Sequence, residues 1–236
     1  MNAILVEGTA LRWGPAPDPE TGPGELSIQV HATAVNRADL LQRMGAYPPP
    51  PGASPILGLE CSGTVIAVAP GVTGFSVGDP VCALLSGGGY AEIVSCPAGQ
   101  VLPVPNGLDL GEAAALAEAL ATTWMVLRDE GRLEGNQRVL IHAGASGIGT
   151  AMIQVCRAWG NPCFVTAGTA EKVARCVALG ADGGVARADG PWEDAVRKWA
   201  PDGVDVIVDP VGGATTEAGQ RVLAIGGRIV VIGLLG

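Results

Sequence analysis

A short glycine-containing loop in the second half of the chain constrains the fold more strongly than any other feature. The segment 138–143, with Val139, Leu140 and Ile141 at its centre, leads directly into this loop, and an apolar segment with helical periodicity, 147–159, follows it at once. The loop consists of Gly144, Ala145, Ser146, Gly147, Ile148 and Gly149. It fits the pattern G-x-G-x-x-G with Ser146 in the middle, where the first residue allows a tight turn and the last lets the helix pack on the strand. The order strand, loop and helix predicts the first unit of a parallel sheet.

The segments around this unit continue the alternation of strands and helices. Asp109 and Glu112 form a capping-box pattern that predicts a helix from 109 to about 128, and Gly180 is expected to end a later helix. The predicted strands are 138–143, 163–167, 204–209, 228–232 and one that ends before Arg187, and the predicted helices are 147–159, 170–179, 191–200 and 214–224. Such alternation is typical of a doubly wound parallel sheet.

The first half of the chain has a different pattern. Apolar and polar residues alternate over 26–34, as expected for a strand with one buried face. Further apolar runs at 64–69, 80–85 and 90–94 are separated by glycine and proline turns. We therefore expect an α/β protein of two domains, with a barrel-like β domain over residues 1–112 and a parallel-sheet domain over residues 113–236.

Composition narrows the class of partners. Fourteen Lys and Arg against 23 Asp and Glu give a net charge of −9, the opposite of the basic surface that nucleic acids and anionic membranes attract. There is no apolar run long enough to cross a bilayer and no signal-peptide pattern, and the six cysteines form no CxxC pair. We expect a cytoplasmic protein with reduced thiols that binds neither nucleic acid nor membrane.

The glycine loop also predicts a ligand. The start of the following helix offers free backbone N–H groups and the positive end of the helix dipole, which suit the pyrophosphate of a dinucleotide. Ser146 is small enough for close approach of the backbone to the pyrophosphate, and it adds a hydroxyl donor. The alternative is an ordinary strand–turn–helix without a ligand. We predict that residues 144–149 bind a dinucleotide.

The end of the second strand distinguishes the two nicotinamide cofactors. An NAD site places Asp or Glu there to bind the ribose hydroxyls, whereas this chain has Gly168 and Thr169. Glu171 is the first carboxylate, it is followed at once by Lys172, and Arg187 lies further on. Small residues with nearby cations suit a 2′-phosphate, so we predict NADPH as the cofactor. The alternative is that both cations are simply solvated.

Several short motifs carry a family resemblance. They are Asn36-Arg37-Ala38-Asp39-Leu40, Tyr47-Pro48-Pro49-Pro50-Pro51-Gly52, Gly58-Leu59-Glu60-Cys61-Ser62-Gly63, Gly78-Asp79-Pro80-Val81, Gly88-Gly89-Tyr90-Ala91-Glu92 and His142-Ala143-Gly144. With these motifs in this order, the chain resembles the medium-chain dehydrogenase/reductase superfamily. The resemblance is to its zinc-independent quinone oxidoreductase branch, which includes the p53-inducible and zeta-crystallin-like quinone oxidoreductases. It implies a chaperonin-10-like β-barrel domain followed by a Rossmann domain.

The same resemblance argues against a metal. Zinc-dependent members hold a catalytic zinc with Cys and His, and the matching positions here are Asn36 and Leu59. The only histidines of the chain, His31 and His142, stand at neither position. We therefore expect no metal site. Without a Lewis acid, an acceptor that is already electron-poor, such as a quinone or an enone, is the expected substrate.

The resemblance also assigns residues to the site. It places Asn36 and Asp39 in the substrate cleft, although both residues equally suit the start of a short helix. The resemblance also implies that Tyr47 faces the quinone. Asn36, Asp39 and Tyr47 are therefore the predicted catalytic residues. The resemblance places Thr122 near the nicotinamide amide and Gly233 beside the nicotinamide end of the cofactor, with a helix residue and a turn glycine as the alternatives.

We therefore expect an NADPH-dependent, zinc-independent quinone oxidoreductase that transfers hydride to a quinone or a related α,β-unsaturated carbonyl. One alternative is an enoyl reductase of the polyketide type, and another is a nucleotide-binding protein without turnover. The sequence stops after the fifth predicted strand of the Rossmann domain, whereas the family continues into a sixth strand that helps to form a dimer. The Rossmann domain is thus expected to be truncated at its C-terminus, with a homodimer for a full-length form.

Overall fold

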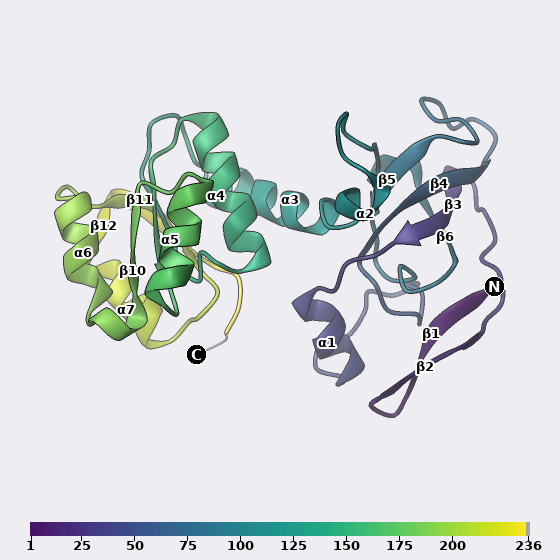
Figure 1. Cartoon of the computed structure of the whole chain (residues 1–236), viewed down its shortest axis with the longest axis horizontal. Helices are drawn as coiled ribbons and strands as arrows, with labels where there is room; N and C mark the ends of the chain where they lie inside the picture. The colour runs from purple at the N-terminus through teal and green to yellow at the C-terminus, as the bar shows by residue number, and fades with distance from the viewer. Residues whose placement is uncertain (235–236) are drawn as a thin grey trace. The chain divides into compact units, whose positions relative to one another are not determined.

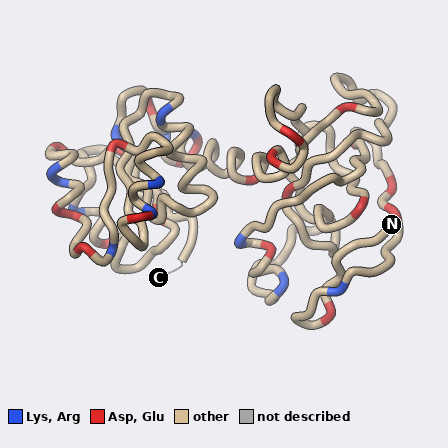
Figure 2. Tube along the Cα trace, in the orientation of Figure 1, with Lys and Arg blue, Asp and Glu red and all other residues tan. Residues whose placement is uncertain are grey.

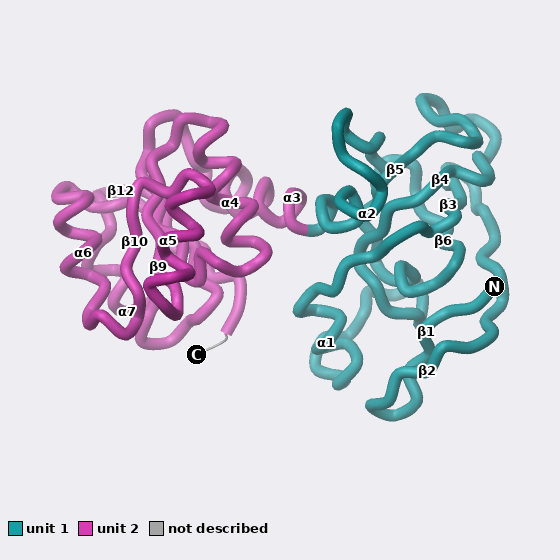
Figure 3. Tube along the Cα trace, in the orientation of Figure 1, with its two compact units in different colours: residues 1–118 teal, residues 119–236 magenta. Residues whose placement is uncertain are grey.

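The computed structural model describes residues 1–234 and divides the chain into two compact units (Figure 3). Unit 1 comprises Met1–Glu118 and unit 2 comprises Ala119–Gly236. Leu235 and Gly236, which belong to the predicted chain end, lie outside the described residues. The predicted domain border after residue 112 falls inside a short helix, α2 (Leu110–Ala113), and the division found here follows Glu118.

Unit 1 is built on an antiparallel sheet. Its order is β6-β3-β4-β5-β7, and the strands are β3 (Glu25–Ala32), β4 (Glu60–Val68), β5 (Pro80–Leu84), β6 (Ile93–Pro97) and β7 (Val101–Pro103). Alternate residues of these strands, such as Leu26 and Ile28 of β3, form one apolar core, as the alternating pattern predicts. A hairpin of β1 (Asn2–Glu7) and β2 (Ala10–Pro15), the helix α1 (Arg37–Arg43) and the turn η1 (Ala98–Gln100) complete unit 1.

Unit 2 contains a parallel sheet with helices on both faces (Figure 1). Its order is β10-β9-β8-β11-β12, and the strands are β8 (Val139–Ile141), β9 (Cys163–Ala167), β10 (Gly183–Ala186), β11 (Val204–Asp209) and β12 (Leu223–Val231). Helices α4 (Gly147–Trp159), α5 (Ala170–Leu179), α6 (Trp192–Trp199) and α7 (Ala214–Gln220) and the turn η3 (Arg187–Asp189) follow the strands. The doubly wound fold is confirmed.

Two apolar cores lie on the two faces of this sheet. Ile141 of β8 belongs to the core that contains Met152 of α4, whereas Leu140 belongs to the core that contains Val196 of α6. Neighbouring residues of a strand point to opposite faces, so a strand covered on both sides is apolar throughout. This arrangement explains why β8 and β9 appear in the sequence as continuous apolar runs.

The structure differs from the sequence prediction between residues 109 and 130. In place of one helix from 109 to about 128, α2 ends at Ala113, α3 (Ala117–Trp124) begins after a break, and the π-helical turn η2 (Met125–Glu130) follows. At the start of α3, the N–H of Glu118 donates to the buried carboxylate of Glu60 (3.0 Å). A new helix therefore starts at this long-range contact, and the hydrophobic periodicity of the local sequence gives no sign of the contact.

Other element bounds shift by a few residues. The strand predicted at 90–94 is β6, which begins at Ile93, and the helix predicted over 214–224 ends at Gln220, so that β12 begins at Leu223. Across residues 1–234, none of the helices combines the length and apolar character needed to cross a bilayer. Lys and Arg are interspersed with Asp and Glu along the described trace (Figure 2).

Candidate functional site

The glycine loop between β8 and α4 has the geometry that close packing requires. Ala143 has a positive φ of 53°, and the N–H of Gly144 donates to the carbonyl of Thr166 in β9 (2.9 Å). A methyl group on Gly144 would lie 2.7 Å from the Val165 side chain, and one on Gly149 would lie 2.6 Å from the carbonyl oxygen of Gly144. Both glycine positions of the pattern therefore leave no room for a side chain.

The start of α4 presents backbone donors beside open space. Ser146 is the N-cap residue, and its Oγ accepts the N–H of Gly149 (3.1 Å). Within the described part of the chain, the N–H groups of Gly147 and Ile148 have no acceptor, as expected for the first turn of a helix. A methyl group on Gly147 would have no atom within 4 Å. The loop is therefore shaped to receive an anion at the positive end of the helix dipole.

The carboxyl end of β9 places a cation beside a glycine. A methyl group on Gly168 would lie 3.7 Å from Nη2 of Arg187, so the guanidinium lies next to the strand end. Thr169 caps α5, and its Oγ1 accepts the N–H of Lys172 (3.3 Å), whose side chain is exposed. Neither Lys172 nor Arg187 forms an ion pair with any residue from 1 to 234. Both charges are available to a phosphate.

A buried histidine stands directly before the glycine loop. His142 is only 2% exposed, its Nδ1 pairs with Oγ1 of Thr166 (2.9 Å), and its ring meets that of Trp192 edge to face, with the centroids 4.7 Å apart. Its Nε2 is buried without a hydrogen-bond partner among residues 1–234. Burial lowers the pKa of His142 to about 4, although Asp209 and Glu193 act in the opposite direction. His142 is thus a packed residue directly after β8.

Asp209, which the sequence analysis did not single out, organises the turn after β11. It is fully buried, and its Oδ1 accepts the N–H groups of Val211 (2.8 Å) and Gly212 (3.0 Å). Burial acts to raise the pKa of Asp209, but hydrogen bonds from Thr216, Gly212 and Val211 hold it below its ordinary value. A methyl group on Gly233 would lie 3.0 Å from the carbonyl oxygen of Pro210, so Gly233 lies against this turn.

In unit 1, Asn36 and Asp39 lie together at the start of α1. Asn36 is the N-cap residue, and its N–H donates to Oδ2 of Asp39 (2.8 Å) in a capping box. Asp39 is 1% exposed and also accepts the N–H of Gly58 at Oδ1 (3.2 Å) and the hydroxyl of Tyr90 at Oδ2 (2.9 Å). The side chain of Asn36 donates through Nδ2 to Oε1 of Glu60 (2.8 Å). The structure therefore realises the predicted helix-start role of this pair.

Glu60 and Tyr90 complete a polar cluster with Asn36 and Asp39, and the sequence analysis did not assign either of them to the site. Asp39 and Glu60 are buried, whereas Asn36 and Tyr90 are half-buried. Burial and the hydrogen bond to Asp39 raise the pKa of Tyr90, so its hydroxyl stays protonated and keeps its donor role. Glu60 is 1% exposed at the start of β4. Glu60 stands between Leu59 and Cys61 at the start of an apolar run, and a carboxylate in such a setting is the signal in the sequence that could have identified the cluster.

The remaining predicted residues occupy separate places. Tyr47 follows α1 on a loop, is 48% exposed, and forms no hydrogen bond within residues 1–234. Thr122 is half-buried on α3. Among the described residues, no three His, Cys, Asp or Glu side chains are grouped as a metal site would require.

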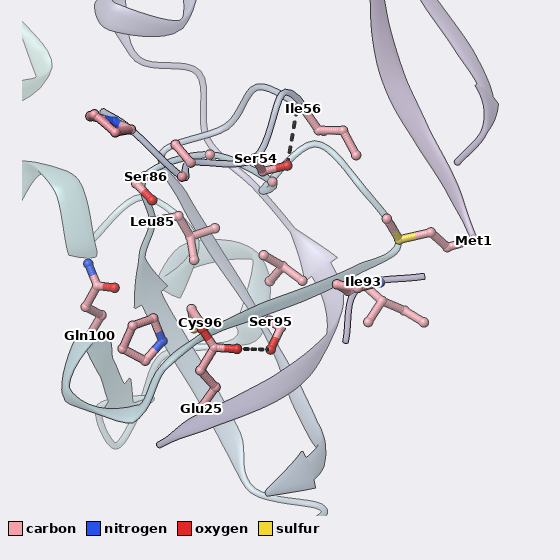
Figure 4. Close-up of a pocket in the computed structure, with 18 residues that line it drawn as sticks. Met1, Glu25, Ser54, Ile56, Leu85, Ser86, Ile93, Ser95, Cys96 and Gln100 are labelled. Atoms are coloured by element: carbon pink, nitrogen blue, oxygen red, sulfur yellow. Dashed lines mark hydrogen bonds between the residues drawn. The ribbon is translucent and has the colours of Figure 1, made fainter. Parts of the chain in front are cut away.

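A cavity of about 310 Å³ also lies in unit 1 (Figure 4). Two pairs of its polar groups form hydrogen bonds: Ser95 donates to the carboxylate of Glu25 (3.0 Å), and the N–H of Ile56 donates to Ser54 (3.2 Å). None of the predicted site residues lines it. The cavity is thus separate from the cluster of Asn36, Asp39, Glu60 and Tyr90, and we assign no ligand to it.

Two family models match the chain. The alcohol dehydrogenase GroES-like domain matches residues 22–106, and the zinc-binding dehydrogenase family matches residues 147–236. The human synaptic vesicle membrane protein VAT-1 homolog is 35% identical over 95% of this chain, which spans 57% of the length of that relative. A mycocerosic acid synthase-like polyketide synthase of Mycobacterium tuberculosis is 36% identical over 90% of this chain, which spans 10% of that protein.

Solved structures agree with the family matches. A mycobacterial protein in complex with NADPH is 33% identical, with a TM-score of 0.87 over 99% of this chain and 74% of that chain. The quinone oxidoreductase of Escherichia coli in complex with NADPH is 25% identical, also with a TM-score of 0.87, over 99% of this chain and 73% of that chain. Together with the GroES-like and parallel-sheet units, these matches show that the chain belongs to the zinc-independent quinone oxidoreductase branch of the medium-chain dehydrogenase/reductase superfamily.

Proposed function

We propose that this oxidoreductase uses NADPH to reduce a quinone or a related α,β-unsaturated carbonyl. The observation that carries the proposal is the anion-binding start of α4 together with Arg187 beside Gly168 at the end of β9. A dinucleotide phosphate presents anionic groups at two places, its pyrophosphate and its 2′-phosphate. The chain supplies backbone N–H groups for the first and free cations for the second.

Each residue has a defined part in this proposal. The loop 144–149 holds the pyrophosphate, and Gly168, Thr169, Lys172 and Arg187 surround the 2′-phosphate. Thr122 and Gly233 are proposed to lie at the nicotinamide end. When bound, NADPH supplies the hydride, so the protein contributes alignment and exclusion of water. Asn36 and Tyr47 are proposed to contact the acceptor, and Asp39, whose carboxylate is occupied by protein donors, to hold Asn36 in place.

The cofactor preference is tested by binding. We expect NADPH to bind more tightly than NADH, and the double variant Lys172→Ala/Arg187→Ala to lose about tenfold or more of this preference, because charged hydrogen bonds to the phosphate are removed. Arg175→Ala/Lys198→Ala is the matched control, since both side chains are exposed cations of the same unit. Calorimetry measures both dissociation constants. Tighter binding of NADH to the unmutated protein would contradict the NADPH assignment.

The acceptor is tested by turnover. With NADPH in excess, a panel of quinones is compared with simple aldehydes, and we expect reduction of quinones only, because no Lewis acid is proposed to polarise an aldehyde oxygen. Aldehyde reduction at equal or higher kcat/KM would contradict the proposal. The predicted cytoplasmic location and the homodimer of a full-length form stay predictions.

An enoyl reductase is the second candidate. The similarity to polyketide synthases, which covers 90% of this chain, favours it. In both reactions a conjugated carbonyl compound accepts the hydride of NADPH, so the same cofactor site serves either. An enoyl thioester and a quinone are assayed side by side, and the higher kcat/KM decides between the two. If the protein binds NADPH but reduces neither, the nucleotide-binding alternative without turnover is the better description.

A further inference from the structure

We propose that Glu60 is a positioning residue that fixes the amide orientation of Asn36. The inference rests on the proposed function, in which Asn36 contacts the acceptor. Glu60 is buried at the start of β4, and its two carboxylate oxygens have different partners. Oε1 accepts Nδ2 of Asn36 (2.8 Å), and Oε2 accepts the N–H of Glu118 at the start of α3 (3.0 Å). One carboxylate thus joins the amide of Asn36 to the backbone of Glu118, which lies 58 residues after Glu60.

Among residues 1–234, the hydrogen bonds to the carboxylate of Glu60 come from N–H donors, those of Asn36 and Glu118. No ion pair of the residues from 1 to 234 includes Glu60. A buried carboxylate that lacks a cation depends on each of its hydrogen bonds, because an unsatisfied buried charge is costly. The bond from Asn36 is therefore strongly favoured, and it constrains both partners.

The chemistry of the two groups allows one orientation. An ionised carboxylate only accepts hydrogen bonds, whereas a carboxamide has a donor side and an acceptor side. If the Asn36 amide turned over, its Oδ1 would face a carboxylate oxygen and leave both acceptors unpaired. With Nδ2 held by Glu60, the Oδ1 and the second N–H of Asn36 have defined directions. A neutral partner at position 60 would not impose this choice.

A second carboxylate fixes the backbone of the same residue. Oδ2 of Asp39 accepts the N–H of Asn36, and Asp39 is itself held by Gly58 and Tyr90. Asn36 is thus fixed at its main chain by Asp39 and at its side chain by Glu60. Such support by surrounding hydrogen bonds is what holds a contact residue in its productive geometry.

A double-mutant cycle tests whether Glu60 acts through Asn36. The proteins are the unmutated chain, Glu60→Gln, Asn36→Ala and the double variant, assayed with NADPH and the best quinone. We expect Glu60→Gln to lower kcat/KM about tenfold, because the glutamine amide can pair with either orientation of Asn36. We also expect no further loss when Glu60→Gln is added to Asn36→Ala. The matched control is Thr33→Val, which removes the hydrogen bond to the Glu60 carbonyl (2.7 Å) but leaves its carboxylate contacts.

Two kinetic results would overturn the inference. One is a loss for Glu60→Gln that is equal in the presence and absence of Asn36, which would mean that the two residues act independently. The other is an unchanged kcat/KM in Glu60→Gln. The dissociation constant of NADPH is measured alongside, and we expect Glu60→Gln to leave it unchanged, since Glu60 orients Asn36, which is proposed to contact the acceptor and not the cofactor.

A measurement without substrate separates this inference from the proposed function. In the NMR spectrum of the unmutated protein, we expect one of the two Nδ2 protons of Asn36 to exchange slowly with solvent, and this protection to be lost in Glu60→Gln but kept in Thr33→Val. If the protection behaves this way and quinones are not reduced, the proposed function fails and the orientation by Glu60 stands. If both Nδ2 protons of the unmutated protein exchange without protection, the inference is overturned, even if quinones are reduced.

Discussion

Lowering the pH from 7 to 5 is expected to destabilise unit 2 through one side chain, His142. The ring is buried, its Nε2 has no hydrogen-bond partner among residues 1–234, and burial lowers its pKa from 6.5 to about 4. In the unfolded chain the imidazole binds a proton at a higher pH than in the folded protein. The stability that depends on neutral His142 is therefore complete above pH 6.5 and is lost as the pH falls toward 4.

The size of the effect follows from this shift in pKa. The difference between 6.5 and about 4 corresponds to about 3 kcal/mol of unfolding free energy in full, of which about 2 kcal/mol is lost between pH 7 and pH 5. Two neighbouring carboxyl groups affect the stability in a lower pH range. The pKa values of Asp209 and Glu193 are lowered, so their contributions are retained above their ordinary values of 3.8 and 4.5 and are lost only as the pH falls further.

Tryptophan fluorescence in a urea titration measures the effect in unit 2. Four of the five tryptophans lie in unit 2, and Trp13 lies in β2 of unit 1, so a Trp13→Phe background makes the signal specific for unit 2. In this background His142→Asn removes the titrating ring but keeps a polar group near Thr166. His31→Asn is the matched control, because His31 is the only other histidine and is exposed.

The expected result is a fall of about 2 kcal/mol from pH 7 to pH 5 in the Trp13→Phe background and with His31→Asn. His142→Asn is expected to be less stable at pH 7, because a packed ring is lost, but to show little change with pH. Equal stability of the background protein at the two pH values would refute the reasoning. So would a His142→Asn protein that keeps the full pH dependence.

Three further predictions concern single positions. Gly149→Ala is expected to lower the unfolding free energy by about 2 kcal/mol, since its methyl group would lie 2.6 Å from a backbone oxygen. Gly147→Ala would meet no atom within 4 Å, so it should change the unfolding free energy by less than about 0.5 kcal/mol but weaken NADPH binding. Equal thermal unfolding temperatures of the two variants would contradict this prediction. Tyr47→Phe is expected to leave the unfolding temperature unchanged, because the ring is 48% exposed, and to reduce quinone turnover, because the hydroxyl is lost from the proposed acceptor contact. Full turnover would contradict a role of this hydroxyl in the contact. Asp209→Asn is expected to cost about 1–3 kcal/mol in urea unfolding, because an amide cannot satisfy all the donors that meet this carboxylate, and an unchanged midpoint would contradict that role.

Elements whose signals are local were predictable to the residue. Helix α4 occupies the predicted range 147–159, α5 occupies 170–179, and β9 and β11 occupy 163–167 and 204–209. Hydrophobic period, capping residues and glycine positions are all read within about ten neighbouring residues. The same local signals located the glycine loop, which the structure places between β8 and α4.

The sequence by itself determined the two-unit α/β architecture, the glycine loop and the likeness to a family. Only the tertiary structure decided which polar groups meet. Asn36 donates to Glu60, 24 residues away, and Tyr90 donates to Asp39, 51 residues away. The helix predicted from 109 to about 128 is interrupted where Glu118 meets the carboxylate of Glu60. Local periodicity contains no information on such contacts, because their energies depend on burial and on partners that the folded chain brings together.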